Sequence, residues 1–204
     1  MAALFDHGRL VAVACSQRIG TGVGGSAAAR LSVSDPAAVD AVTRIGQRLS
    51  WHGGLTCDYF TGSTGRPRFI ECNPRTTEPG NAAASGVNLP LLTMALATGG
   101  PLPRRVLTAR PGVRTRSTMA LALGAAQRQG KRRAVLGALG RALGAGPPLA
   151  GSREVLTPVR DPLSLLPAAA VVGALLVRPR AVEALAGGAV SAYEVTDRTI
   201  ARLG

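Results

Sequence analysis

Hydrophobic and polar positions follow two different periods along the first hundred residues, which predicts a mixture of strands and helices. Residues 9–16 and 28–33 are rich in small and β-branched side chains and are joined by a glycine-rich segment, which is typical of two strands and their connection. Apolar residues then recur every three or four positions over 36–50, directly after Asp35 and Pro36. This spacing predicts a capped helix with one apolar face.

Two more extended runs follow this helix. Residues 55–60 and 67–73 flank the segment Thr-Gly-Ser-Thr-Gly-Arg at 61–66, whose composition is typical of the turn in a β-hairpin. Residues 76–86 are small and polar and predict a loop, and residues 89–97 predict a short apolar helix. Together with the preceding elements, these segments predict an antiparallel sheet backed by two helices.

The pattern changes near residue 100. Residues 121–143 have a helical apolar spacing, residues 144–151 form a glycine- and proline-rich linker, and residues 152–204 indicate one proline-interrupted helix and a short terminal element. We therefore expect a mixed α/β domain over residues 1–100 and a mainly helical extension over residues 101–204.

Positive charge is concentrated in this second part. The 204 residues contain 24 Lys and Arg against 11 Asp and Glu, and Lys131 is the only lysine. Residues 104–141 contain many basic residues and no acid, but no aromatic side chains are interleaved with them, which removes base stacking as a source of nucleic-acid affinity. A solvated arginine-rich helical face is therefore favoured over a nucleic-acid site.

The cysteines and the hydropathy of the chain indicate the cellular compartment in which the protein is expected. Cys15, Cys57 and Cys72 are an odd number at wide spacing, no cleavable signal sequence precedes them, and each lies in a predicted strand as a small apolar residue. We expect a cytoplasmic protein. The apolar stretch 163–177 is shorter than the roughly 20 residues that a spanning helix needs, so it predicts a buried helix and no membrane partner.

The predicted hairpin carries the most informative side chains. Asp58 lies on its first strand, and alternation places Phe69, Glu71 and Asn73 on one face of its second strand. Two close carboxylates repel each other unless a cation neutralises them, and Mg²⁺ prefers carboxylate, amide and phosphate oxygens. Arg75, just beyond the strand, has the planar donors that recognise phosphate. These residues outline a metal and phosphate site, although spacing alone favours the simpler alternative of a solvated hairpin face.

The surrounding residues add a family resemblance. Gly-Leu-Thr-Cys-Asp at 54–58 precedes Phe-Ile-Glu-Cys-Asn-Pro-Arg at 69–75, and Glu-Pro-Gly-Asn-Ala-Ala-Ala-Ser-Gly-Val-Asn-Leu-Pro follows at 78–90. This succession resembles the C-terminal core of ATP-grasp enzymes, nearest to the carbamoyl-phosphate synthetase and biotin carboxylase branch. In that branch, an acid on one strand precedes a Glu-x-Asn-Pro-Arg motif on the next. The resemblance covers about residues 5–100.

The resemblance implies an activity and a role for each motif residue. Asp58, Glu71 and Asn73 would hold one or two Mg²⁺ (or Mn²⁺) ions on the phosphates of ATP. Arg75 would act as a catalytic and cofactor-binding residue on the γ-phosphate or acyl phosphate, and Arg18 would be a second anion contact. The implied reaction is an ATP-dependent ligation of a carboxylate substrate to an amine or thiol through an acyl phosphate.

Other features of the family extend or restrict this interpretation. Glu78 and Asn81 lie where family members often place substrate or metal contacts. ATP-grasp enzymes clamp the nucleotide between two halves, and the first half usually contributes lysines, whereas this sequence has no lysine before Lys131. We therefore expect a partial enzyme that needs a missing N-terminal half or a companion chain. The alternative is a non-catalytic interaction module that binds an acidic protein or nucleic acid through its arginines.

Two further candidates receive simpler interpretations. The glycine-rich segment 20–25 has no following Gly-Lys-Ser/Thr and lies between two predicted strands, so neither a P-loop nor a dinucleotide fingerprint is supported. His7 and His52 are far apart in sequence, with no acid at a catalytic-triad or zinc-site spacing. Surface or packing roles are therefore expected for both histidines.

Overall fold

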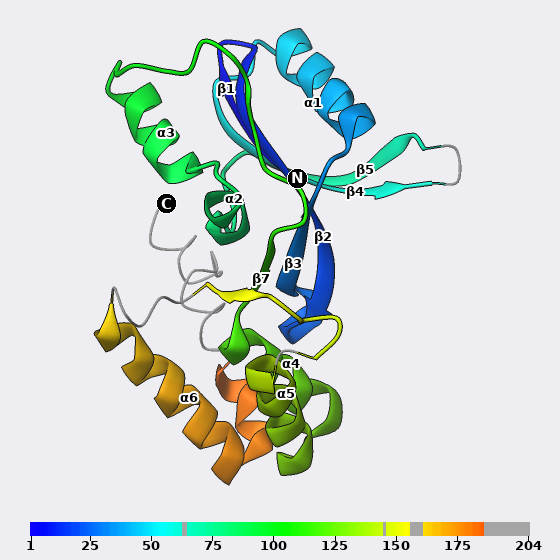
Figure 1. The fold of residues 1–204 in the computed structure, drawn as a ribbon, viewed down its shortest axis with the longest axis vertical. Coiled ribbons are helices and arrows are strands. Elements are labelled where there is room, and N and C mark those ends of the chain that lie inside the picture. The colour runs from blue at the N-terminus through cyan, green and yellow to red at the C-terminus, as the bar shows by residue number, and fades with distance from the viewer. Residues whose placement is uncertain (63–64, 145, 156–160, 186–204) are drawn as a thin grey trace, which may run out of the picture. The chain divides into compact units, whose positions relative to one another are not determined.

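The computed structural model describes residues 1–62, 65–144, 146–155 and 161–185, which form a mixed α/β fold (Figure 1). The chain divides into two compact units. Unit 1 contains residues 1–19, 29–115 and 151–155. Unit 2 contains residues 20–28, 116–150 and the described part of 156–204. The boundary expected between residues 100 and 101 therefore lies inside unit 1.

One mixed sheet runs in the order β5-β4-β1-β2-β3-β7-β8, with β6 paired to β2. Its strands are β1 (Ala2–Asp6), β2 (Arg9–Thr21), β3 (Ala27–Val33), β4 (Gly53–Thr61), β5 (Pro67–Asn73), β6 (Leu107–Thr108), β7 (Arg114–Arg116) and β8 (Arg153–Glu154). The β4–β5 ladder is the predicted antiparallel hairpin, and the β1–β2 and β1–β4 ladders are also antiparallel, whereas β6 is parallel to β2.

Strand β1 is absent from the sequence-based prediction, although it lies between β4 and β2 in the sheet. Ala3, Leu4 and Phe5 are all fully buried, because they face cores on both sides of the sheet. A strand buried on both faces has a continuous apolar run rather than an alternating one, and its period therefore does not identify it.

Helices cover both faces of the sheet in unit 1 (Figure 1). Helix α1 (Pro36–Arg48) packs Val42 into the first core with Phe5 and Cys57. Helices α2 (Gly80–Ala84) and α3 (Leu89–Ala97) contribute Ala82 and Leu89 to the second core, on the other face. The helices predicted over 36–50 and 89–97 are thus confirmed, whereas α2 lies in the segment predicted as a loop.

The start of α1 illustrates how local sequence determines an element. Asp35 is the residue before the helix, and its Oδ1 accepts a hydrogen bond from the Ala38 amide at 3.0 Å. The other carboxylate oxygen, Oδ2, accepts from the Tyr59 hydroxyl at 2.9 Å. Asp35 therefore caps the helix and ties it to β4.

Unit 2 is mainly helical, as the sequence predicts. The helices among its described residues are η1 (Val23–Gly25), α4 (Thr118–Gln129), α5 (Arg132–Gly144), η2 (Pro162–Ser164), α6 (Leu165–Val177) and η3 (Pro179–Ala181). Gly130, at φ +59°, ends α4, because the left-handed conformation terminates helices. The helical pattern predicted over 121–143 is therefore divided between α4 and α5.

The apolar helix α6 is buried along one side only. Leu175 is fully buried among residues of α4 and α5, whereas Leu166 is 66% exposed and Val177 is 72% exposed. The prediction of a buried helix over 163–177 is therefore wrong for most of its length. Among the described residues, no helix has the length and apolar character to cross a membrane. The terminal element expected near the end of the chain lies outside those residues.

Candidate functional site

The β4–β5 ladder brings the predicted metal ligands together. Asp58 lies directly opposite Glu71, and Thr56 lies directly opposite Asn73. Residues opposite each other in an antiparallel pair point to the same face, with Cβ atoms about 4.5–5.5 Å apart. Asp58, Glu71 and Asn73 therefore share one face of the sheet. We call these three residues the oxygen cluster.

The position of Phe69 differs from the predicted one. Tyr59 pairs with Phe69, although Asp58 pairs with Glu71, so Ile70 is an extra residue in β5. This β-bulge shifts Phe69 to the opposite face, where it packs against the first core and its ring centroid lies 5.9 Å from that of Tyr59. The prediction that Phe69 shares a face with Glu71 is therefore wrong, because strict alternation fails across a bulge.

Hydrogen bonding within the oxygen cluster orients the amide. The Asn73 Nδ2 donates to Glu71 Oε1 at 2.8 Å, which leaves the amide oxygen as the acceptor end of Asn73. Among the residues that the structure describes, neither Asp58 nor Glu71 takes part in an ion pair. Like charges directly opposite each other destabilise a sheet, and both of these carboxylates are exposed.

Backbone contacts fix Arg75 beside this cluster. The Arg75 amide donates to the Asn73 carbonyl at 2.8 Å, and the Thr56 hydroxyl donates to the Arg75 carbonyl at 2.9 Å. The Thr77 amide in turn donates to the Thr56 hydroxyl at 3.1 Å. The Arg75 side chain is exposed. Thr56 thus holds the residue after the strand in place while the guanidinium stays accessible.

Two other cations of unit 1 lie on β2 and β3, beyond β1 in the sheet order. Arg18 is on β2, on the same face as the oxygen cluster but two strands away in the sheet order, so it is outside the β4–β5 pair. Arg30, on β3, forms an ion pair with Glu78 and donates to the Ser16 hydroxyl at 3.4 Å. Sequence analysis does not single out Arg30, because only the pairing of distant segments brings it to Glu78.

The Asn81 side chain connects elements of the fold. It is buried, and Nδ2 donates to the Thr115 hydroxyl at 2.9 Å and to the Val113 carbonyl at 3.4 Å. These bonds connect α2 to β7 and its preceding segment. The expectation that Asn81 contacts substrate or metal is therefore not supported by its position.

The cysteines behave largely as packing residues. All three are free thiols, Cys15 and Cys57 are buried, and Cys72 is exposed. Burial, followed by the hydrogen bond with Cys72, raises the pKa of Cys57 to about 12. A thiol with so high a pKa is a poor nucleophile at neutral pH, which is consistent with a filler role for Cys57.

Part of the positive charge predicted to form a solvated face has structural partners. Arg110 Nε donates to the Ser85 carbonyl at 3.4 Å in unit 1. In unit 2, Arg128 Nη1 donates to the Thr21 carbonyl at 3.1 Å and Arg132 Nη2 to the Val177 carbonyl at 2.8 Å. These arginines donate to backbone carbonyl groups. Part of the positive charge of the basic stretch therefore has a structural role and does not serve only as a binding surface for partners.

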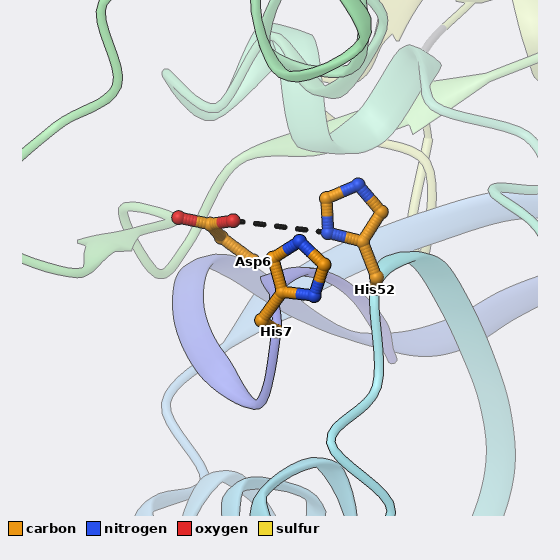
Figure 2. Close-up of side chains that lie close together, drawn as sticks. All are labelled: Asp6, His7 and His52. Atoms are coloured by element: carbon orange, nitrogen blue, oxygen red, sulfur yellow. Dashed lines mark ion pairs between the residues drawn. The ribbon is translucent and has the colours of Figure 1, made fainter. Parts of the chain in front are cut away.

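A second cluster, which sequence analysis does not predict, lies at the other end of β4. His7 stacks on His52 with ring centroids 4.2 Å apart, and Asp6 lies beside them (Figure 2). The ladder between β1 and β4 pairs Phe5 with Gly53, so the next positions outward are those of Asp6 and His52. Both histidines lie at the surface, as expected, but the sequence does not indicate that they meet, because strand β1 is missing from the prediction. We call Asp6, His7 and His52 the histidine cluster.

No known family model matches this chain, and no curated protein is significantly similar to it.

Proposed function

We propose that this chain contributes the metal- and phosphate-binding part of an ATP-grasp-type ligase, which joins a carboxylate to an amine or a thiol at the expense of ATP. The observation that carries the proposal is the direct pairing of Asp58 with Glu71, together with the hydrogen bond from Asn73 to Glu71. The motif from Phe69 to Arg75 supports the choice of family, since it has the Glu-x-Asn-Pro-Arg order of ATP-grasp enzymes.

The donor set of the oxygen cluster fits Mg²⁺ or Mn²⁺. Two carboxylates and an amide oxygen are hard ligands, and the Asn73 hydrogen bond directs the amide nitrogen to Glu71 and away from a cation. Asp58, Glu71 and Asn73 would hold the ion. When bound, the ion would neutralise charge on the phosphates of ATP and on the phosphoryl group during transfer.

Arg75 has a separate task in this mechanism. Its backbone is held beside the cluster by the hydrogen bonds to Asn73 and Thr56, and its side chain is exposed. A guanidinium binds two oxygens of one phosphoryl group, so Arg75 would orient the γ-phosphate for attack by a carboxylate oxygen and stabilise the resulting acyl phosphate. Arg18 on β2 and Arg30 on β3, which lie beyond β1 in the sheet order, would add positive potential for an anionic substrate.

The proposal includes a division of labour. ATP-grasp enzymes bind adenine and exclude water with a second half, which we assign to a companion chain or another part of the protein. We therefore expect ATP to bind weakly to the residues described here. Three free thiols favour a reducing compartment, and we place the ligase in the cytoplasm.

The test is a calorimetric titration of the chain with ATP, with and without Mg²⁺. Glu71→Gln removes one negative charge but keeps an oxygen that can accept the hydrogen bond from Asn73, so it alters the site with little effect on the fold. Asn73→Ala removes a ligand and this hydrogen bond. We expect Mg²⁺-dependent binding to weaken about tenfold or more in each variant.

Asp40→Asn is the matched control. Asp40 lies on the exposed side of α1, where it pairs with Arg44, so its substitution makes the same change of charge outside the cluster. Equal heats for the wild type and Glu71→Gln would contradict the proposal. Salt-sensitive binding of nucleic acid or an acidic protein that is unchanged in Glu71→Gln, without binding of ATP, would instead favour the interaction module.

A further inference from the structure

The histidine cluster brings three metal-binding side chains to one point. One ligand atom from each of Asp6, His7 and His52 lies within 4.8 Å of the other two. The His52 Nδ1 is 3.7 Å from the Asp6 Oδ1, and the two imidazole planes are stacked at 27° (Figure 2). Two ligands joined to one ion by bonds of about 2.05 Å at the tetrahedral angle lie about 3.3 Å apart. To reach that geometry, the ligand atoms must approach by up to about 1.5 Å and the stacked imidazoles must rotate until their nitrogens converge.

The backbone holds the two contributing segments together. His7 and Gly8 form the turn between β1 and β2, and the Gly8 amide donates to the Trp51 carbonyl at 2.7 Å. The Trp51 amide donates to the Gly46 carbonyl of α1 at 2.8 Å. The residue before His52 is therefore bonded both to the turn that carries His7 and to a helix packed on the core. Backbone hydrogen bonds of the fold therefore hold the segments of this cluster together.

The carboxylate is oriented by a separate partner. Arg9 Nη2 donates to Asp6 Oδ2 at 3.0 Å, and Arg9 Nη1 donates to the Pro103 carbonyl at 3.1 Å. The other oxygen, Oδ1, is the one that faces His52. Metal-binding carboxylates are commonly held by a hydrogen bond of this kind on the oxygen that does not bind the ion. Arg9 is therefore a positioning residue for Asp6.

The chemistry of these donors selects a class of ion. Two imidazole nitrogens and one carboxylate oxygen suit Zn²⁺, Co²⁺ or Ni²⁺, whereas Mg²⁺ prefers a set made of oxygens. We propose that Asp6, His7 and His52 bind one such transition-metal ion, with water completing its coordination. The histidines are exposed and Asp6 is half-buried, so the ion is accessible from solvent. This site is independent of the proposed nucleotide chemistry.

The sequence provides an unusually clean test, because His7 and His52 are the only histidines. The full chain, without an affinity tag and freed of metal by a chelator, is titrated with Zn²⁺ in a calorimeter. We expect one equivalent to bind, and each of His52→Gln, Asp6→Asn and His7→Asn to weaken binding about tenfold or more. Asparagine is chosen at position 7 because His7 has φ +45°, a conformation that Asn tolerates.

Two controls separate this site from other surface ligands. Cys72→Ser removes the exposed thiol, and Asp40→Asn removes an exposed carboxylate on α1. Both variants should bind Zn²⁺ as the wild type does. The imidazole resonances of the wild type give a second readout that needs no variant, and both histidines should shift together and saturate at one equivalent of Zn²⁺. Unchanged affinity in the His7→Asn/His52→Gln double variant, or loss of binding in Cys72→Ser, would overturn the proposal.

Discussion

The oxygen cluster and the histidine cluster lie along β4 and the residue before it, but they differ in the ligand atoms that they present. Asp58 lies within β4, and His52 directly precedes it, six positions earlier in the chain. At about 3.3 Å per residue in a strand, these two residues are separated by roughly 20 Å. One cluster offers hard oxygens only, and the other offers two imidazoles and one oxygen. A single sheet therefore presents two ligand sets suited to different classes of cation.

The comparison also shows that both clusters depend on one core. Phe5 precedes Asp6 and Cys57 precedes Asp58, and both are fully buried in the core that packs on α1. The side chains proposed to bind ions are exposed or half-buried, whereas the residues that place them are buried. Substitutions in the clusters should therefore act separately, whereas substitutions in this core should act on both.

The largest effect is expected for Gly46→Val in α1. A Cβ at this position would lie 2.1 Å from the Phe5 Cε1, and the Phe5 ring is fully buried. Overpacking of this kind should lower the free energy of unfolding by about 3 kcal/mol. Urea denaturation measures it, and binding of both Mg²⁺-ATP and Zn²⁺ should weaken together. Gln47→Val places the same side chain at the adjacent exposed position and should leave the binding of Mg²⁺-ATP and of Zn²⁺ unchanged. A fully stable Gly46→Val protein would contradict the packing described for this core.

No effect beyond about twofold is expected when the variants of one cluster are titrated with the ligand of the other. Mutations more than about 10 Å apart without shared partners usually act independently. The His7→Asn/His52→Gln protein should therefore bind Mg²⁺-ATP within about twofold of the wild type, and Glu71→Gln should bind Zn²⁺ within the same limit. Calorimetric titration of each variant with each ligand measures this. A loss of Zn²⁺ binding in Glu71→Gln would show that the two clusters are one coupled site.

A pH-dependent effect is expected for the core beneath the oxygen cluster. Burial raises the pKa of Cys57 from 9.0 to about 12, so the thiol stays protonated in the folded protein at pH values where it ionises in the unfolded chain. The contribution of the protonated Cys57 thiol to the free energy of unfolding is complete below pH 9. It is lost progressively as the pH rises toward 12. Urea denaturation from pH 8 to pH 11 should show falling stability, and Cys57→Ala should flatten the curve. Constant stability of the wild type over this range would contradict the burial of Cys57.

Local patterns in the sequence were sufficient for much of unit 1. The hairpin that carries the oxygen cluster was predicted because its turn and its alternation involve neighbouring residues only. Helix α1 was predicted because Asp35 caps it and its apolar residues have a regular spacing. The β-bulge at Ile70 was not predicted, because the pattern of apolar and polar residues in the two strands does not show where one strand contains an extra residue.

The sequence alone determined which donor atoms this protein has and placed Asp58, Glu71 and Asn73 on one face, because a short hairpin brings together residues that are close in the chain. Only the tertiary structure revealed the histidine cluster. Its assembly requires β1 to pair with β4 over a separation of about 50 residues, with Phe5 opposite Gly53. A strand buried on both faces has no period that identifies its neighbours, and long-range pairing is decided by the packing of the whole core.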